Sequence, residues 1–267
     1  MKEHLSEELK ATGRTLQKAE PLYVIMSEGT RLPFVECDKE TCDDEVLVFD
    51  SRETVESAAK ELAKEGYLIR IMELPVKQRL AFFSSLFPIG VNAVKLNKGS
   101  KEERLLELSV LITRPALPRF SAEIAEQLKT DHTIKFHMEN PEFHLTAIYY
   151  IQKVRNKHAR LWEEEVKELY EEMMIHYREG YYISARLEDG AMPLLKKKDG
   201  LALQPLFTDL QEFAKFQRAN AGMKLQNFIV SEKGFLKFLT KDASGIVINP
   251  FGISLVLQVK REPVVQA

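Results

Sequence analysis

The sequence has no long hydrophobic run and few cysteines, and each shortage excludes a class of protein. No stretch approaches the roughly 18 apolar residues that a membrane-spanning helix needs. Among its 267 residues there are only two cysteines, Cys37 and Cys42, so a disulfide-built fold is excluded and free thiols in a reducing compartment are expected. The charged start MKEHLSEELK contains no apolar signal region. We therefore expect a cytoplasmic protein.

The recognisable catalytic motifs are also missing. The chain contains no G-x-S-x-G, no G-x-x-x-x-G-K, no G-x-G-x-x-G and no H-E-x-x-H. A net charge of −2 provides no general attraction for nucleic acid or acidic membranes. The basic stretches 153–160 and 195–200 carry no interleaved aromatics. We predict no cofactor, no nucleic-acid partner and no membrane partner, although dispersed catalytic residues remain possible.

The overall composition is typical of a globular protein, with 45% hydrophobic and 29% charged residues. Residues 1–20 predict an amphipathic helix. Alternating and helical periodicities then predict strands at 21–26, 32–36, 46–50, 67–74 and 92–97, and helices at 52–66 and 76–87. The following region predicts a strand at 107–115, a helix capped by Ser121, a β-branched strand at 144–154 and a helix at 156–179 ended by Gly180.

The order of elements before residue 98 recurs in residues 181–258. Three short segments match in order, with Leu32–Phe34, Val48–Ser51 and Ala93–Asn97 corresponding to Met192–Leu194, Leu206–Asp209 and Gly245–Asn249. Such order-preserving similarity indicates an internal duplication. We predict an α+β fold of two related domains, each a mixed β-sheet covered by helices, joined by a long helix. The predicted parts are an N-terminal helix (1–20), a first domain (21–138), a connecting strand and helix (139–180), and a second domain (181–267).

The segment LQPLFTDLQEFAKF, residues 203–216, followed by GIVINPFG, residues 245–252, resembles the SseB family. That family's pattern is a strand ending in Phe-Thr-(Ser/Asp), a helix, and a later apolar strand ending in Asn-Pro. The match is closest over 181–258 and weaker over 21–97, where Asp50-Ser51 and Asn97-Lys98 replace these steps. The resemblance implies a bacterial cytoplasmic α+β protein without an assigned reaction. We therefore expect a non-enzymatic protein that acts through protein interaction or regulation.

Candidate site residues lie at two strand ends in the second copy. Asn249-Pro250 is typical of a strand stop, because proline cannot donate to a sheet and asparagine caps turns; alternatively, the Asn249 amide and the Gly252 backbone face a ligand. Phe207, Thr208 and Asp209 predict a buried aromatic followed by a helix N-cap.

Two further hypotheses remain open from these residues. The first is that the chain binds an amino-acid-like small molecule between the copies, at the strand ends marked by Asn97 and Asn249. A hydrolase or transferase with dispersed catalytic groups is the other. Duplication lowers the expectation of a homodimer, so we predict a monomer or a weak homodimer.

Three histidines, His132, His137 and His144, raise a metal hypothesis. Their spacings of five and seven match neither a helical pair nor a known zinc cluster. Cys37 and Cys42 have finger-like spacing, but no second ligand pair follows. We predict a solvated loop for the histidines and no metal site.

Overall fold

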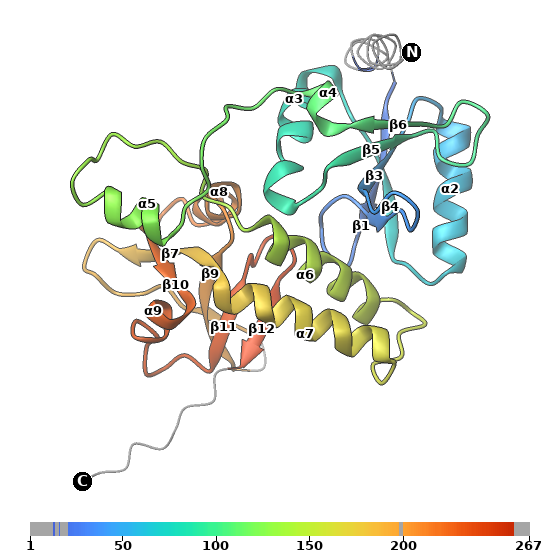
Figure 1. The fold of residues 1–267 in the computed structure, drawn as a ribbon. Helices are drawn as coiled ribbons and strands as arrows, with labels where there is room; N and C mark the ends of the chain where they lie inside the picture. The colour runs from blue at the N-terminus through green and yellow to red at the C-terminus, as the bar shows by residue number, and fades with distance from the viewer. Residues whose placement is uncertain (1–12, 14–15, 17–20, 198–199, 259–267) are drawn as a thin grey trace.

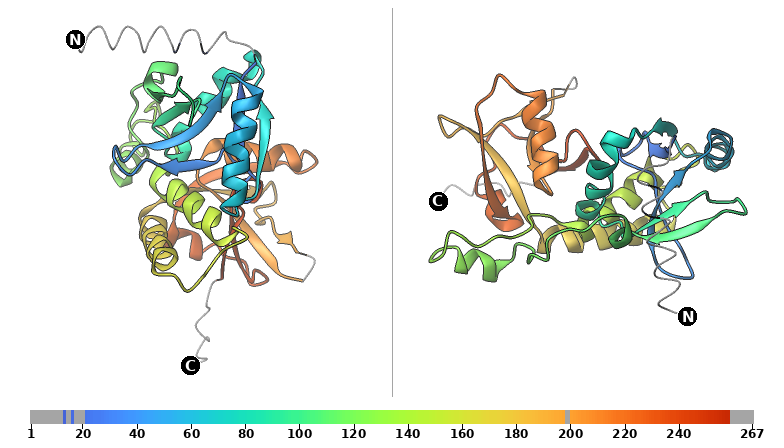
Figure 2. Two further views of the ribbon diagram at one scale, coloured as in Figure 1. Left: turned by 90° about the vertical axis from the view of Figure 1, so that its right-hand side faces the viewer. Right: turned by 90° about the horizontal axis from the view of Figure 1, so that it is seen from above.

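The computed structural model describes residues 13, 16, 21–197 and 200–258, and the helix predicted within residues 1–20 lies outside them except for Gly13 and Leu16. The described chain forms two mixed sheets of six strands, each packed with helices. The predicted α+β architecture of two related domains is confirmed. Seen from above, the sheets lie toward opposite ends of the molecule (Figure 2).

The first sheet has the strand order β4-β1-β3-β5-β6, with β2 paired to β3. Its elements are β1 (Tyr23–Ser27), β2 (Val35–Cys37), β3 (Asp44–Phe49), α2 (Arg52–Lys64), β4 (Ile69–Glu73), α3 (Val76–Ser84), the 3-10 turn η1 (Phe87–Ile89), β5 (Ala93–Leu96) and β6 (Arg104–Glu107). Gly66, at φ +93°, follows the end of α2.

The second sheet repeats this arrangement, with the order β10-β7-β9-β11-β12 and β8 paired to β9. Its elements are β7 (Tyr181–Leu187), β8 (Leu195–Lys196), β9 (Ala202–Phe207), α8 (Leu210–Ala219), β10 (Leu225–Ser231), α9 (Glu232–Leu236), β11 (Gly245–Ile248) and β12 (Leu255–Gln258). Strands β3 and β5 are parallel, as are β9 and β11. The two sheets therefore share one topology.

Four helices lie between the sheets in sequence: α4 (Leu108–Leu111), α5 (Ala122–Gln127), α6 (Pro141–Val154) and α7 (Glu164–Glu179). One face of each sheet is covered by its own helix, α2 on the first and α8 on the second. The other faces contribute to one shared hydrophobic core that includes Val48, Ile248 and Ile148. The domains are thus not independent hydrophobic units, because their largest core is common to both.

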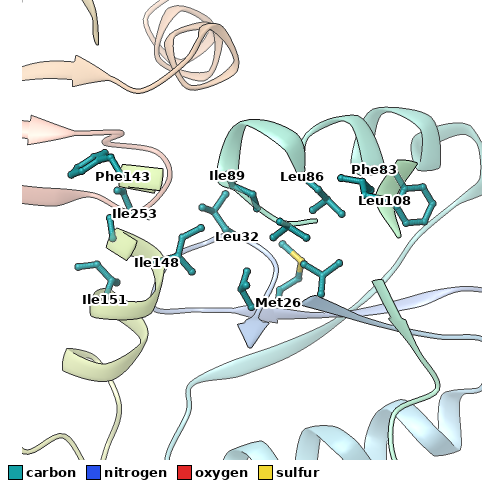
Figure 3. Close-up of a cluster of buried hydrophobic side chains, with 14 of the residues drawn as sticks. Met26, Leu32, Phe83, Leu86, Ile89, Leu108, Phe143, Ile148, Ile151 and Ile253 are labelled. Carbon is teal, nitrogen blue, oxygen red and sulfur yellow. The ribbon is translucent and has the colours of Figure 1, made fainter. Parts of the chain in front are cut away.

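Helix α6 supplies the centre of that core. Its side chains Phe143, Ile148 and Ile151 pack in one cluster with Ile253 of the second domain and Leu32 of the first (Figure 3). All three are at most 3% exposed. Helix α7 packs alongside α6 and leads into β7 (Figure 1).

Hydrogen bonds fix the C-terminal half of α6 to the first sheet. The Gln152 amide accepts from the Val35 backbone nitrogen at 3.1 Å and donates to the Val35 carbonyl at 2.8 Å. Among the strands that the structure describes, β2 pairs with β3 alone, so Gln152 satisfies the groups that a second neighbouring strand would otherwise bind. One turn earlier, the Tyr149 hydroxyl donates to Asp44 Oδ1 at 2.6 Å.

The connecting strand predicted at 144–154 is wrong, because these residues belong to α6. Asn140 is the N-cap and Pro141 occupies the first turn, a helix-start signature that outweighs the β-propensity of the isoleucines and tyrosines. The buried residues of α6 are Phe143, His144, Thr146, Ala147, Ile148, Ile151 and Gln152. This spacing follows a helical period, so packing against two sheets selects the helix.

Two other expected elements differ from the structure. The strand predicted at 107–115 ends at Glu107, and residues 108–111 form the short helix α4, which buries Leu108 and Leu111. The helix predicted at 156–179 begins only at Glu164. Asn156 explains the delay, because its side chain accepts from the His158 nitrogen and donates to the Glu65 carbonyl, which favours a turn over a helix. Gly180 follows the helix as predicted.

Helices α2 and α5 each begin at a serine, but only one of these serines caps its helix through the side chain. Ser121 accepts from the Ile124 nitrogen and caps α5 as predicted, whereas Ser51 occupies the N-cap of α2 without a side-chain bond. Within the described residues, no helix is long and apolar enough to cross a membrane.

Replacing Gln152 by alanine tests the attachment of α6 to the first sheet. Val35 is 1% exposed, so Gln152→Ala leaves a buried N–H and a buried carbonyl unpaired. We expect the free energy of unfolding to fall by about 1–3 kcal/mol in urea denaturation. Gln217→Ala, at an exposed position of α8, is the matched control and should change it by less than about 0.5 kcal/mol. Equal effects of the two substitutions would contradict this role of Gln152.

Candidate functional site

The ends of the parallel strands are held by one asparagine in each sheet. Asn249 follows β11 at φ 49°, and Asn97 follows β5 at φ 53°. The Asn249 nitrogen donates to the Leu206 carbonyl at 2.9 Å, while its Oδ1 accepts from the Thr208 nitrogen at 3.0 Å. Asparagine suits this position because it tolerates a left-handed backbone and its side chain can bond nearby peptides.

Asn97 repeats this bridge in the first sheet. Its nitrogen donates to the Val48 carbonyl at 2.8 Å, and its Oδ1 accepts from the Asp50 nitrogen at 3.1 Å. Asn249 and Asn97 are 0% and 3% exposed. Both side chains thus join neighbouring parallel strands.

In the second domain alone, a buried polar cluster forms around this bridge, consisting of His144, Thr208, Asp209 and Asn249. Thr208 Oγ1 donates to Asp209 Oδ2 at 2.7 Å and accepts from Asn249 Nδ2 at 2.8 Å. Its distance to His144 Nδ1 is 3.2 Å. Asn249 Nδ2 also lies 3.4 Å from His144 Nε2. With the proton on Nδ1, the imidazole donates toward Thr208 and accepts from Asn249, which is the tautomer that this network assigns.

Asp209 connects the buried polar cluster to helix α8. Its Oδ1 accepts from the Gln211 and Glu212 nitrogens at 2.8 and 3.0 Å, so it is the predicted N-cap. Burial of Asp209 raises its pKa, but the hydrogen bonds from His144, the Thr208 hydroxyl and the Glu212 N–H together outweigh burial. The pKa of the Asp209 carboxyl is therefore held below its ordinary value.

Although the cluster contains Thr, His and Asp, its geometry is not that of a catalytic triad. In a triad the nucleophile and the acid bind opposite nitrogens of the imidazole. Here Thr208 and Asp209 both face His144 Nδ1, at 3.2 and 3.6 Å, and Nε2 faces Asn249. All four residues are at most 3% exposed. The arrangement orients and satisfies buried groups, and it presents no hydroxyl to a substrate.

Helix α6 begins against the same strand ends. The Asn140 side chain donates to the Thr208 carbonyl at 3.1 Å and to the Tyr181 carbonyl. His144 follows one turn later. The N-terminal half of α6 is thereby attached to the second sheet by two polar side chains.

The structure brings together Thr208, Asp209 and Asn249 but separates the remaining predicted positions. Phe207 packs on the α8 side of the sheet with Phe213 and Phe216. Pro250 lies in the turn after β11, while Asn97 follows β5 of the other sheet.

Gly252 is buried in that same turn. A Cβ there would come within 2.8 Å of Glu212 Oε2. The glycine therefore leaves room for the Glu212 carboxylate of α8, which a larger side chain would have to displace.

The prediction of a solvated histidine loop is wrong for His144, which is buried in α6 at 0% exposure. The Asn140-Pro141-Glu142 start and the apolar spacing that follows were the signals that could have placed it on a helix. His132 is exposed, and His137 Nε2 lies 3.0 Å from the Pro115 carbonyl.

Among the described residues no group of His, Cys, Asp or Glu could hold a metal ion. Cys37 and Cys42 are free, as predicted, and both are exposed.

A separate cavity of about 420 Å³ opens beside the start of α6. Its lining includes Arg119, Ser121, Glu139, Glu142 and His176. Arg119 pairs with Glu142 at 2.5 Å, Glu139 pairs with Arg114 outside the cavity, and the Ser121 hydroxyl caps α5. Burial raises the pKa of Glu142, but the hydrogen bond and charge of Arg119 and a backbone hydrogen bond together outweigh burial and hold that pKa below its ordinary value. The cavity thus contains compensated charges and an occupied hydroxyl.

Glycine substitutions separate the side-chain role of the asparagines from their backbone conformation. Glycine accepts positive φ without strain, so Asn249→Gly and Asn97→Gly remove only side-chain bonds. We expect Asn249→Gly to lower the free energy of unfolding by about 1–3 kcal/mol, and Asn97→Gly by less. The difference arises because only the Asn249 amide also binds Thr208 Oγ1 and faces His144. If urea denaturation shows the same loss of unfolding free energy for both variants, the contacts of Asn249 with Thr208 Oγ1 and His144 do not stabilise the fold.

Asp209 should make stability sensitive to acid. Because its pKa is lower in the folded chain, its ionised form stabilises the fold above the unfolded-state value of about 3.9. That contribution is lost as pH falls through the lower folded-state pKa. Urea midpoints measured from pH 7 to pH 3 should therefore fall less steeply for Asp209→Asn than for the parent chain. Asp242→Asn, at an exposed position, should retain the parent slope; an unchanged slope for Asp209→Asn would contradict the assignment.

Comparison with known proteins gives little further information. No family model matches the chain, and no curated protein matches it. The chain is similar to a solved structure described as Tic22 from Plasmodium falciparum, with 14% identity, 86% of this chain and 87% of that chain covered, and a TM-score of 0.23. A second similar structure is described as Anabaena Tic22 (protein transport). It is 12% identical, the match covers 87% of this chain and 84% of that chain, and the TM-score is 0.20. TM-scores this low do not establish a shared fold.

Proposed function

We propose that this chain is a non-enzymatic, SseB-like protein that acts by binding another protein. The observation that carries the proposal is the Trp162 surface, which consists of Leu161 and Tyr170, two residues that line one hollow, and of Trp162, the chain neighbour of Leu161. The side chains of Leu161, Tyr170 and Trp162 are 60%, 42% and 73% exposed. Trp162 is the chain's only tryptophan. Tryptophan and tyrosine dominate the energetics of protein interfaces, and adjoining exposed apolar side chains mark interaction sites.

The local structure explains why the Trp162 surface is exposed. The turn at Asn156 ends α6, and α7 starts only at Glu164, so Leu161 and Trp162 lie in the connection between the helices. Helix α7 buries Val166, Met173 and Tyr177. This burial fixes α7 against the rest of the fold while Leu161 and Trp162 remain accessible.

Binding is favoured over chemistry by the state of the polar groups. The buried polar cluster is closed to solvent, and its imidazole lacks a triad geometry. Asn97 and Asn249 direct their side chains into their own sheets, which disfavours a small-molecule site at those strand ends. The proposal therefore includes no cofactor and no metal, and it assigns no role to nucleic acid or membrane.

We further infer that the domains arose by duplication and that the protein occurs in the bacterial cytoplasm as a monomer or weak homodimer. The shared strand order and the matching bridges of Asn97 and Asn249 support duplication. Two exposed free cysteines suit a reducing compartment.

Comparative capture tests the proposed function. The parent chain, the double variant Leu161→Ser/Trp162→Ser and the control Leu80→Ser are immobilised, and proteins bound from bacterial lysate are quantified by mass spectrometry. Leu80 is 67% exposed and lies on α3. We expect at least one protein to be retained by the parent and control but reduced about tenfold by the double variant, as a loss of 1.4 kcal/mol would produce. Melting temperatures should stay equal.

An unchanged set of captured proteins for the double variant would contradict the proposed surface. Catalytic turnover by the parent in a broad substrate screen would contradict the non-enzymatic role.

A further inference from the structure

The Trp162 surface adjoins a groove between helices α6 and α7. The groove encloses about 330 Å³ and is lined by Tyr150, Leu161, Val166 and Tyr170, with Lys167 and Glu171 also in its lining. The rings of Tyr150 and Tyr170 lie 5.5 Å apart. The lining is therefore mostly apolar and aromatic, which is the composition that receives an apolar anchor residue.

Carboxylates dominate the helix beside this groove. Six glutamates occur within ten residues of the chain: Glu163, Glu164, Glu165, Glu168, Glu171 and Glu172. Three of them are neutralised locally, since Glu163 pairs with Arg160 at 3.6 Å, Glu164 with Lys167 at 3.0 Å and Glu165 with Lys153 at 2.8 Å.

The remaining three carboxylates are left without a lysine or arginine. Glu172 lies 3.8 Å from His176 and near the acidic Asp44, and Glu168 and Glu171 form no ion pair within the described part of the chain. Because Glu171 also lines the groove, negative charge borders the apolar surface directly.

We infer that the Trp162 surface binds a basic amphipathic helix of the partner protein; this inference rests on the proposed function. An apolar side chain of that helix occupies the groove, and its lysines or arginines meet Glu168, Glu171 and Glu172. Helix-in-groove binding uses apolar anchors at helical spacing, and complementary charge selects the partner and speeds its association. The same carboxylates repel phosphate, which disfavours nucleic acid and anionic lipid as occupants.

Trp162 provides a direct readout, because a single exposed tryptophan reports its own environment. The full chain is titrated with a synthetic Leu/Lys amphipathic helical peptide free of tryptophan, with its Leu/Glu counterpart, and with vesicles containing phosphatidylserine. We expect a saturable blue shift of tryptophan emission with the Leu/Lys peptide alone. Its affinity should fall at least tenfold as salt is raised, since screening weakens exposed charge pairs.

One variant tests the apolar part of the surface, and a second tests its acidic part. Tyr170→Ser should weaken binding of the Leu/Lys peptide at least tenfold, and Glu168→Lys/Glu171→Lys should reverse the preference toward the Leu/Glu peptide. The matched control Glu123→Lys/Glu126→Lys changes two glutamates at the same spacing on the short helix α5 and should bind like the parent. Circular dichroism and melting temperature verify folding of each variant.

The outcomes separate this inference from the proposed function. Equal binding of the two peptides, or equal loss in the α5 control, overturns the basic-helix inference and leaves protein binding at the Trp162 surface standing. Absence of binding by either peptide, with capture also unaffected by Leu161→Ser/Trp162→Ser, overturns both. A blue shift with vesicles but with neither peptide overturns the inference in favour of a membrane surface.

Discussion

Helix α6 is the element on which the rest of the structure depends. Asn140 and His144 in its first half bond the strand ends of the second sheet, and Gln152 in its last turns bonds the edge of the first. Between them, apolar residues of α6 complete a core shared by both sheets. A single helix therefore contributes both polar attachment and hydrophobic burial to each domain. Since groups on both sheets need α6 for their partners, we expect the two domains to unfold together.

The two domains repeat a topology but differ in how they use it. Each sheet joins two parallel strands with an asparagine in left-handed conformation. Only in the second sheet does this asparagine also meet a threonine and a histidine. The physical reason is the direction of α6, whose N-terminus reaches the second sheet and carries His144 there. The buried polar cluster is thus a structural feature of one domain alone.

Much of the architecture followed from local patterns. Alternating apolar residues predicted most strands, and capping residues such as Ser121, Asp209 and Gly180 marked helix ends. The matching segments of the two domains marked Asn97 and Asn249 as equivalent positions, and both side chains form the same bridge. The errors occurred where tertiary packing decided the outcome, as at residues 144–154, whose β-branched and aromatic content suits a strand but whose burial against two sheets requires a helix.

By itself, the sequence determined the α+β class, the repeated element order and the strand-end role of Asn249, because these depend on periodicity and on residues with strong local preferences. Only the tertiary structure decided that His144 joins Thr208, Asp209 and Asn249, since these positions are far apart in the chain and meet through helix packing. It likewise decided that Trp162 stays exposed while Val166 and Met173 are buried. Which apolar side chains remain accessible depends on how α7 packs against α6, and no local pattern records that choice.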